Sequence, residues 1–218
     1  MGDQLEPLIS TYESVKSHPD DIYRAFEAWP VDRDNYYAVR DMTPAGPIER
    51  AAQFIYLNKT AWNGLYRVNR QGRFNVPFGL PKSTNIVPLE ALRAASHILR
   101  SADLEHGDFE TTLADARRGD LVFVDPPYVT SHNNNGFVEY NEKLFSWADQ
   151  VRLATTCAEL ARKGVIVVAT NAAHETIREL YADFHIREFS RFSTLAGKPE
   201  NRKPVTEMVI SSNRWSDE

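Results

Sequence analysis

The stretch Asp120-Leu-Val-Phe-Val-Asp-Pro-Pro-Tyr128 decides the fold. The four apolar residues from Leu121 to Val124 predict a short buried strand, which ends at Asp125 just before two prolines. The strand cannot continue through the prolines, because proline has no N–H to donate and its φ is fixed. A second apolar run, Val165-Ile-Val-Val-Ala-Thr170, predicts another buried strand. A long helix is predicted between them over 146–163, and the order strand, helix, strand is typical of parallel pairing.

The same alternation continues toward the C-terminus. A helix is predicted over 173–181, and strands are predicted near 184–190 and 205–211. Together these elements predict an α/β fold with a largely parallel sheet and helices on its faces. Ligands of such sheets bind beyond the carboxyl ends of the strands, and Asp125 lies at such an end.

The N-terminal half is predicted to be mainly helical. Two helices are expected over 5–29, and single helices are expected over 32–41, 47–59 and 88–99. Residues 62–82 differ, because glycines and prolines interrupt a run of aromatic and basic residues, which predicts a hairpin or an ordered loop.

Charge is unevenly distributed along the chain. The formal net charge is −5, which argues against a general coat protein for nucleic acids. From Lys59 to Lys82, however, there are five basic residues and no acidic residue, so this segment carries a charge of +5. Such a segment can bind phosphates even in an acidic protein.

Composition narrows the class of protein further. Of 218 residues, 42% are hydrophobic and 25% are charged, as in ordinary globular proteins. No apolar run approaches the length of a spanning helix, and the N-terminus MGDQLEPLIS has no basic or apolar region of a secretory signal. Cys157, the single cysteine, is expected to be a small core residue. A single cysteine allows no internal disulfide, so a reducing cytoplasm is predicted. Because no segment is long and apolar enough to span a bilayer, no membrane partner is predicted.

The residues from Asp125 to Tyr128 combine three chemical features. Asp125 supplies acceptor oxygens, the prolines hold a rigid loop with free carbonyls, and Tyr128 supplies a flat face on which a base can stack. One interpretation is a strand end followed by a rigid turn. The other is a site for an exocyclic amine such as adenine N6. There the Asp125 carboxylate and the Pro126 carbonyl hold the two amine hydrogens and stabilise the positive charge that develops on the nitrogen.

Two segments resemble the DNA adenine methyltransferase family of the D12 class, which acts on GATC-type sites. One is Val122-Phe-Val-Asp-Pro-Pro-Tyr128. The other is Phe54-Ile-Tyr-Leu-Asn-Lys-Thr-Ala-Trp-Asn-Gly-Leu-Tyr-Arg67, which continues to Arg73-Phe-Asn-Val-Pro-Phe-Gly79. The resemblance extends from about residue 3 to residue 212.

This resemblance implies a Rossmann-like, S-adenosylmethionine-dependent methyltransferase sheet with an inserted, mainly helical DNA-recognition subdomain and a hairpin. Residues 1–16 and 101–218 would form the catalytic core, and residues 17–100 would form the target-recognition subdomain. The implied reaction is transfer of a methyl group from S-adenosylmethionine to N6 of a flipped adenine in double-stranded DNA, at a GATC-like site. Direct displacement needs no metal.

The family motifs also imply residues for catalysis and for the cofactor. Asp125, Pro126, Pro127 and Tyr128 match the catalytic motif. Asp108 and Phe109 match a pair that contacts the cofactor's adenine, and Asp125 and Asp3 complete the implied cofactor set. Asp108 has an alternative role as a helix N-cap. For Asp3, the match is interrupted by Leu5, which stands where the family has Asn.

The DNA-contacting residues implied by the resemblance lie between 59 and 77. Arg67 matches an arginine that reads a guanine edge, and Trp62 stands where an aromatic residue enters the base stack. Asn63 matches a residue beside the flipped base, Leu65 an apolar wedge and Pro77 a flanking contact. The basic residues Lys59, Arg70 and Arg73 are expected to contact DNA through phosphates. Core packing is the alternative for Trp62 and Leu65, and solvated loop charge is the alternative for Arg70 and Arg73.

One part of the family pattern is missing from the sequence. The family has a Phe-x-Gly-Gly-Gly-like cofactor loop before the position of Asp3, and nothing before residue 107 resembles it. The first strand of the sheet would be absent as well. Three interpretations follow: a fragment or a coding start placed too late, one half of a split enzyme whose partner chain supplies the loop, or a degenerate remnant. The competing function is therefore a non-catalytic DNA-binding module.

Overall fold

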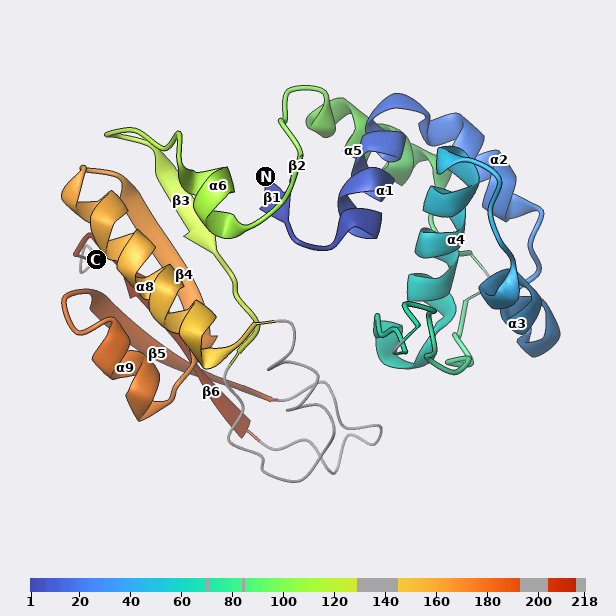
Figure 1. Cartoon of the computed structure of the whole chain (residues 1–218). Helices are drawn as coiled ribbons and strands as arrows, with labels where there is room; N and C mark the ends of the chain where they lie inside the picture. The colour runs from blue at the N-terminus through green and yellow to red at the C-terminus, as the bar shows by residue number, and fades with distance from the viewer. Residues whose placement is uncertain (70, 84, 129–144, 193–203, 215–218) are drawn as a thin grey trace. The chain divides into compact units, whose positions relative to one another are not determined.

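The chain folds into two compact units in the computed structural model (Figure 1). The structure describes residues 1–69, 71–83, 85–128, 145–192 and 204–214. The first unit is Met1–Thr112 and the second is Leu113–Glu218. This division follows packing. The predicted boundaries at 16/17 and 100/101 instead separate a catalytic core from a DNA-recognition subdomain, and this functional division stays a prediction.

The second unit is built on a four-stranded sheet in the order β3-β4-β6-β5. Its strands are β3 (Leu121–Val124), β4 (Ile166–Ala172), β5 (His185–Phe192) and β6 (Pro204–Ser211). β3 and β4 run parallel, as predicted, but β6 lies between β4 and β5 and is antiparallel to both. The expectation of a largely parallel sheet is thus wrong for the C-terminal strands. The alternation of apolar residues identifies a strand but does not give its direction.

Two helices cover one face of this sheet, α8 (Trp147–Arg162) and α9 (Glu175–Leu180) (Figure 1). Ser146 and Asp149 form a capping box that starts α8. Residues of β4 alternate between buried and half-buried, and Val167, Ala169 and Asn171 point to the covered face. The apolar side chains Leu121 and Phe123, on the other face of β3, are 66% and 63% exposed.

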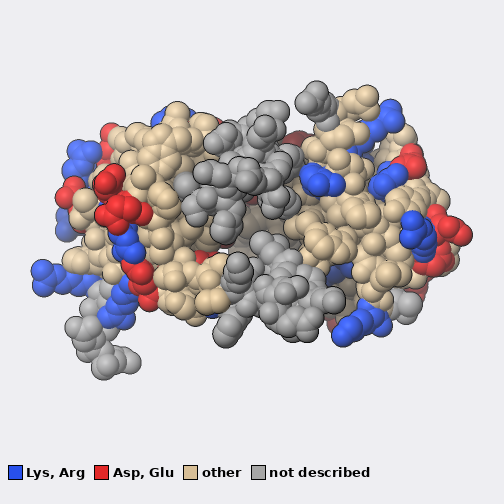
Figure 2. Space-filling model, turned by 90° about the horizontal axis from the view of Figure 1, so that it is seen from below, with Lys and Arg blue, Asp and Glu red and all other residues tan. Residues whose placement is uncertain are grey.

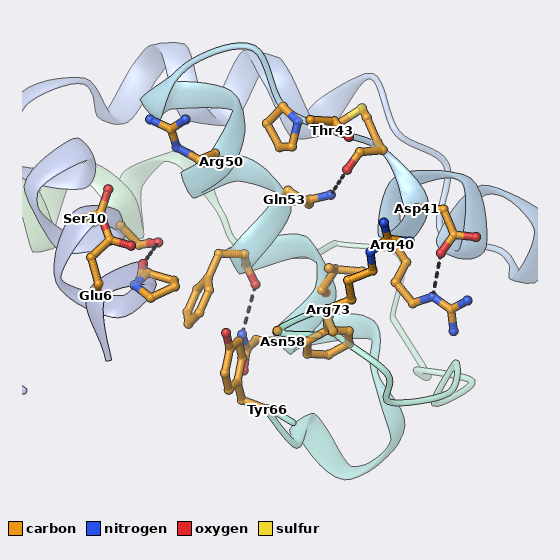
Figure 3. Close-up of a pocket in the computed structure, with 18 residues that line it drawn as sticks. Glu6, Ser10, Arg40, Asp41, Thr43, Arg50, Gln53, Asn58, Tyr66 and Arg73 are labelled. Atoms are coloured by element: carbon orange, nitrogen blue, oxygen red, sulfur yellow. Dashed lines mark hydrogen bonds and ion pairs between the residues drawn. The ribbon is translucent and has the colours of Figure 1, made fainter. Parts of the chain in front are cut away.

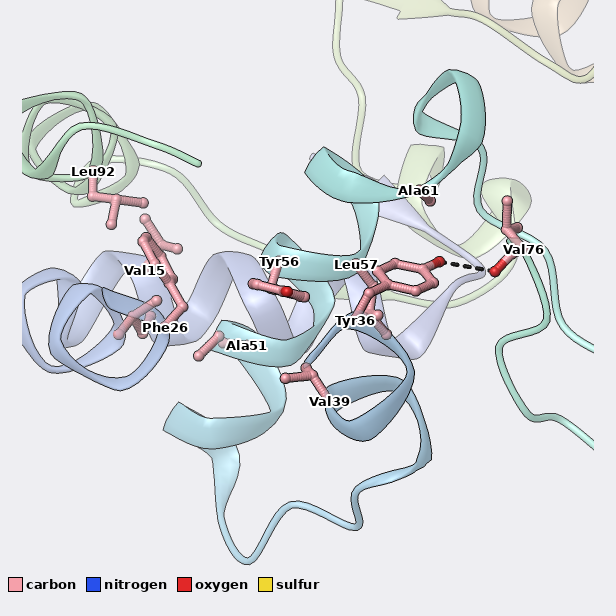
Figure 4. Packing of buried hydrophobic residues seen from close by; sticks show 12 residues of the cluster. Val15, Phe26, Tyr36, Val39, Ala51, Tyr56, Leu57, Ala61, Val76 and Leu92 are labelled. Carbon is pink, nitrogen blue, oxygen red and sulfur yellow. Dashed lines mark hydrogen bonds between the residues drawn. The ribbon is translucent and has the colours of Figure 1, made fainter. Parts of the chain in front are cut away.

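The first unit is mainly helical. Its helices are α1 (Glu6–Ser17), α2 (Pro19–Glu27), α3 (Arg33–Asp41), α4 (Pro47–Thr60), the short 3-10 helix η1 (Trp62–Gly64), α5 (Leu89–Leu99) and α6 (Phe109–Leu113), whose last residue begins the second unit. The helices α1 to α5 confirm the predicted helical segments, whereas η1 and α6 were not predicted as helices. The apolar faces of α1 to α5 meet in one core around α4 (Figure 4). Tyr36 and Tyr56 are fully buried there, and burial raises the pKa of each to about 12.

Residues 61–79 form the predicted hairpin-like loop, and the core anchors it. Antiparallel bridges join Ala61 to Phe78 and Val68 to Phe74. The buried Tyr36 hydroxyl donates a 2.8 Å hydrogen bond to the Val76 carbonyl (Figure 4). A Cβ on Gly79 would lie 2.4 Å from the Ala61 carbonyl oxygen, so this close backbone crossing requires glycine.

A two-stranded parallel sheet joins the N-terminus to a later segment of the same unit. β1 (Gly2–Asp3) pairs with β2 (Glu105–His106), and Asp3 is the register partner of His106. Among the described residues, no helix is long and apolar enough to cross a bilayer. Cys157 is buried in the second unit, as predicted, and burial raises the pKa of its thiol to about 11.

Candidate active site and DNA-contacting surface

Asp125 lies at the carboxyl end of β3, directly beside the end of β4. The register pairs Val124 with Ala169, so Asp125 and Thr170 are the next residues on two adjacent parallel strands. The Thr170 hydroxyl donates a hydrogen bond to Oδ1 of Asp125. Asp125 is exposed. Oδ1 of the carboxylate is therefore held by Thr170, while the exposed side chain remains accessible to a ligand.

The loop after Asp125 is fixed from the covered face of the sheet. Gln150 of α8 donates a 2.8 Å hydrogen bond to the Pro127 carbonyl, and Asn171 of β4 donates a 3.2 Å bond to the Gln150 amide oxygen. Gln150 and Asn171 are 2% and 1% exposed. The expectation that both proline carbonyls are free is thus wrong for Pro127, because a buried amide uses its oxygen. The Pro126 carbonyl accepts no hydrogen bond from the residues that the structure describes.

Tyr128 is half-buried and joins the polar cluster around Asp125. Burial raises its pKa, the hydrogen bond with Thr170 lowers it, and the negative charges of Asp125 and Glu207 raise it. Glu207 of β6 is 7% exposed and pairs with Arg191 of β5, whose Nε lies 2.7 Å from Oε1. The buried acid next to Tyr128 is therefore neutralised by an arginine, as a buried charge requires.

Asp3 and Asp108 come together although 105 positions separate them. Asp3 ends β1, and Asp108 follows β2, its parallel neighbour. The side chain of Gln4 donates a 3.2 Å hydrogen bond to Oδ2 of Asp108. Two carboxylates thus sit where parallel strands end, which is where sheets of this kind bind ligands. They can accept hydrogen bonds from hydroxyl or amino groups.

Asp108 also has its alternative role as a helix N-cap. Its Oδ1 accepts a 2.9 Å hydrogen bond from the backbone N–H of Glu110, in the first turn of α6. Phe109 begins that helix and is half-buried. Both oxygens of this carboxylate thus have a protein partner, the Glu110 N–H at Oδ1 and the Gln4 amide at Oδ2. Each carboxylate oxygen can accept more than one hydrogen bond, so the cap and a ligand contact are compatible.

The predicted DNA-contacting side chains that the structure describes lie on the hairpin and on the end of α4. Most of them are exposed, namely Lys59, Trp62, Asn63, Arg67, Arg73 and Pro77. Trp62 is 45% exposed, which is incompatible with core packing, whereas Leu65 packs partly against the core. Arg70 lies outside the described residues. Figure 2 shows Lys and Arg side chains spread over the visible face of the first unit, and Asp and Glu side chains near its outer edge beside some of them.

Arg67 is held by the opposite strand of the hairpin. Its Nε donates a 2.8 Å hydrogen bond to the Asn75 side-chain oxygen, and a second nitrogen lies 3.4 Å from the Asn75 carbonyl. The Asn75 backbone N–H in turn donates to the Arg67 carbonyl. This arrangement reduces the entropy that the arginine would lose on binding a base.

A groove of about 610 Å³ runs between α1, α4 and the hairpin (Figure 3). Glu6 and the ion pair of Arg40 with Asp41 line it together with Arg50 and Arg73, and neither of these last two guanidinium groups has a hydrogen-bond or ion-pair partner among the described residues. One wall is aromatic, with ring centroids 5.2 Å apart for Phe54 and Tyr66 and 5.6 Å apart for Tyr66 and Phe74. Unpaired arginines in a groove are suited to binding an anionic ligand.

The structure adds residues that the sequence interpretation did not single out. They are Thr170, Gln150 and Glu207 around the Asp125 loop, and Asn75 and Arg50 on the first unit. Thr170 had a usable signal, because it ends the second predicted strand as Asp125 ends the first. Gln150 and Glu207 had none, since their contacts depend on helix placement and on the antiparallel β6.

Comparisons with known proteins are consistent with this geometry. Residues 1–195 match the family model of the D12 class N6 adenine-specific DNA methyltransferases. A Type II methyltransferase of Lactococcus lactis subsp. cremoris, M1.LlaDCHI, is 32% identical over 97% of this chain and 78% of its own length. The Type II methyltransferase M.MjaIII of Methanocaldococcus jannaschii is 31% identical over 96% of this chain and 78% of its own.

A relative with a different name covers nearly the whole chain as well. The DNA adenine methylase of Serratia marcescens is 32% identical over 96% of this chain and 80% of its own length. The family match covers most of the chain, and it includes the hairpin, Asp108 and the Asp125 loop. The chain therefore belongs to the family of D12 class N6 adenine-specific DNA methyltransferases.

Proposed function

We propose that Asp125 and the Pro126 carbonyl form the acceptor pair with which this methyltransferase binds adenine N6. The observation that carries this assignment is the accessible Asp125 carboxylate, held by Thr170 at the end of β3 beside a loop fixed by Gln150. D12 class enzymes use S-adenosyl-L-methionine, which supplies a methyl group on a positively charged sulfur.

The two acceptors act on the adenine amine. Its lone pair is delocalised into the ring, so the free amine is a poor nucleophile. Hydrogen bonds from its two hydrogens to Asp125 and Pro126 favour a more tetrahedral nitrogen whose lone pair is directed at the methyl carbon. A nitrogen–carbon bond forms as the carbon–sulfur bond breaks, and the bonding electrons stay on sulfur. The amine proton then leaves to solvent, and the carboxylate stabilises the positive charge in between.

Tyr128 and Phe109 are proposed to contact the two adenine rings of the reaction. The Tyr128 ring would stack on the flipped base, and its half-buried position near Asp125 and Thr170 would fix the orientation of the ring. Phe109 would pack beside the cofactor's adenine. Asp108 and Asp3 fit the cofactor, because their carboxylates accept hydrogen bonds and the adenosine offers an amino group and ribose hydroxyls.

DNA recognition is assigned to the hairpin. Arg67 would read a guanine edge of a GATC-like site, Trp62 would enter the base stack, and Asn63 and Leu65 would lie beside the flipped base. Pro77 would contact the DNA that flanks the recognised site. Lys59, Arg70 and Arg73 would bind phosphates, and the exposure of Lys59 and Arg73 supports this role.

The fold is proposed to be the Rossmann-like sheet of this enzyme class, with residues 17–100 as its DNA-recognition insertion. A further strand with a glycine-rich cofactor loop would pack at β3, from this polypeptide or from a partner chain. The exposed Leu121 and Phe123 side chains lie on the open face of β3 and support a further element that covers this face together with the added strand, because apolar residues on a central strand are normally covered.

The function assigned to Asp125 is tested by the substitution Asp125→Ala. Methyl transfer to duplex DNA should fall at least about a hundredfold, because the acceptor in the transition state is removed, while DNA affinity is retained. Transfer is measured in a single turnover with labelled cofactor, and DNA affinity by fluorescence anisotropy. The control Asp183→Ala removes an exposed acid of the same unit and should change neither. Wild-type turnover by Asp125→Ala would refute the assignment.

A further inference from the structure

Thr170 is placed beside Asp125 by the backbone of the sheet. Because Val124 pairs with Ala169 in parallel register, Asp125 follows β3 at the level of Thr170, which lies near the carboxyl end of β4, two positions before Ala172. Thr170 alternates with the buried Ala169 and Asn171, so its side chain lies on the face of β4 that α8 does not cover. The hydrogen bond from its hydroxyl to Oδ1 of Asp125 therefore joins two strand ends.

Of the two acceptors, the Asp125 carboxylate is the one that needs the hydrogen bond from Thr170 to fix its orientation. The Pro126 carbonyl belongs to the backbone, and the neighbouring Pro127 carbonyl is tied to Gln150. The Asp125 carboxylate, by contrast, is exposed and can rotate about its Cβ–Cγ bond. A hydrogen bond to one oxygen of a planar carboxylate also fixes the position of the other oxygen. The second acceptor is then oriented relative to the first before the base enters.

Resting on the role proposed for Asp125, we propose that Thr170 is a positioning residue for methyl transfer, which orients the Asp125 carboxylate toward the adenine amine. Thr170 does not touch the reacting atoms and transfers no proton. Tyr128 lies in the same cluster, since both Thr170 and Asp125 affect the pKa of its hydroxyl. Asn171, the next residue, acts on the same loop from the covered face through Gln150. The end of β4 thus fixes the tetrapeptide at two points.

The test replaces the hydroxyl by a methyl group of equal size in the full chain. Thr170→Val should lower the single-turnover rate of methyl transfer roughly tenfold to a hundredfold and leave DNA affinity unchanged, because only alignment is impaired. Thr170→Ser keeps the donor and should restore most of the rate. Thr156→Val is the matched control, since the half-buried Thr156 hydroxyl bonds to the Arg152 carbonyl within α8.

A second readout does not depend on turnover. The carboxyl-carbon NMR signal of Asp125 should shift in Thr170→Val, stay at its wild-type position in Thr156→Val and return toward it in Thr170→Ser. If Thr170→Val fails to fold, Thr170→Cys replaces it, since a thiol is a much weaker donor of nearly serine size.

The outcomes separate the inference from the proposed function. An unchanged rate and an unchanged Asp125 signal in the variant without the hydroxyl overturn the role of Thr170, provided that Asp125→Ala is inactive. An equal loss of rate in Thr170→Val and Thr170→Ser also overturns it, because it would indicate packing and not the hydrogen bond. Wild-type turnover by Asp125→Ala would instead overturn the function assigned to Asp125, whatever the Thr170 variants do.

Discussion

Arg67 is the residue at which sequence specificity can be tested most directly. If it reads a guanine edge, Arg67→Ala should relax the preference for one base pair by roughly 1–3 kcal/mol and spare the others. Competition binding with duplexes that differ at single positions measures this. Asn75→Ala, which removes the side-chain acceptor of Arg67, should give a smaller loss at the same position. An equal loss on every sequence would mean that Arg67 contacts only phosphate.

Single residues also show how far sequence alone identifies the candidate site. Asp125 could be found because two prolines stop a strand directly after it, which is a local signal. Thr170 follows from the same reasoning once the two strands are taken as parallel neighbours. Glu207 could not be found, because its place near Tyr128 depends on β6 entering the sheet between β4 and β5. The resemblance of Asp3 to the family's cofactor-binding acid is weak in the sequence, and the pairing of β1 with β2 places it near Asp108.

At the scale of the element, the hairpin depends on one close backbone crossing. Gly79→Ala would bring a Cβ to within 2.4 Å of the Ala61 carbonyl oxygen, so the hairpin must shift. The free energy of unfolding should fall by about 1–3 kcal/mol, and DNA affinity should fall with it, because Trp62 lies directly after Ala61. Urea unfolding and anisotropy measure the two effects.

The control for this substitution is Gly107→Ala, where an added Cβ meets no atom within 4 Å. It should leave the free energy of unfolding nearly unchanged. If Gly79→Ala is as stable as the Gly107 variant and binds DNA equally well, the crossing does not constrain the hairpin.

Helices and strands were largely predictable, whereas strand direction was not. The helices of the first unit follow from apolar spacing and from proline or acidic residues in their first turns, as at Pro19 and Pro47. The antiparallel β6 differs from the prediction because an alternating apolar pattern is the same in both directions. Direction is set by pairing with residues distant in the chain, such as Ile210 with Ala169.

For the molecule as a whole, charge distribution matters more than net charge. The chain has a net charge of −5, yet the stretch from Lys59 to Lys82 carries five basic residues and no acidic one. Arg73 of this stretch lines the groove together with Arg50, and both are unpaired among the described residues. Long-range repulsion from DNA is therefore compatible with local phosphate binding.

This charge distribution predicts how DNA affinity depends on salt. Removing one phosphate-binding side chain should reduce the slope of log affinity against log salt by about 0.9, so Arg50→Ala with Arg73→Ala should reduce it by up to about 2. Anisotropy titrations at several salt concentrations give the slope. Arg24→Ala with Arg162→Ala, which removes two exposed arginines away from the groove, should leave it unchanged. A slope equal to that of the wild type in the groove variant would exclude phosphate binding there.

Packing and function divide the whole molecule differently. Packing separates Met1–Thr112 from Leu113–Glu218, so Asp3 and Asp108 belong to the first unit and Asp125 to the second. The sequence suggested a catalytic core split around an insertion, because its motifs follow the order of the family. Contacts within a unit could not be inferred from that order, since they depend on which helices share a core.

The buried Cys157 has a practical consequence for studying this enzyme. It is the only thiol, it is fully enclosed, and burial raises its pKa to about 11. Maleimide and iodoacetamide dyes react with exposed thiolates, so they should not label Cys157 in the native protein. A cysteine introduced at an exposed position such as Lys59 would then carry the only fluorophore, without prior removal of a natural cysteine. Base flipping and hairpin movement could be followed in real time on an otherwise unaltered chain.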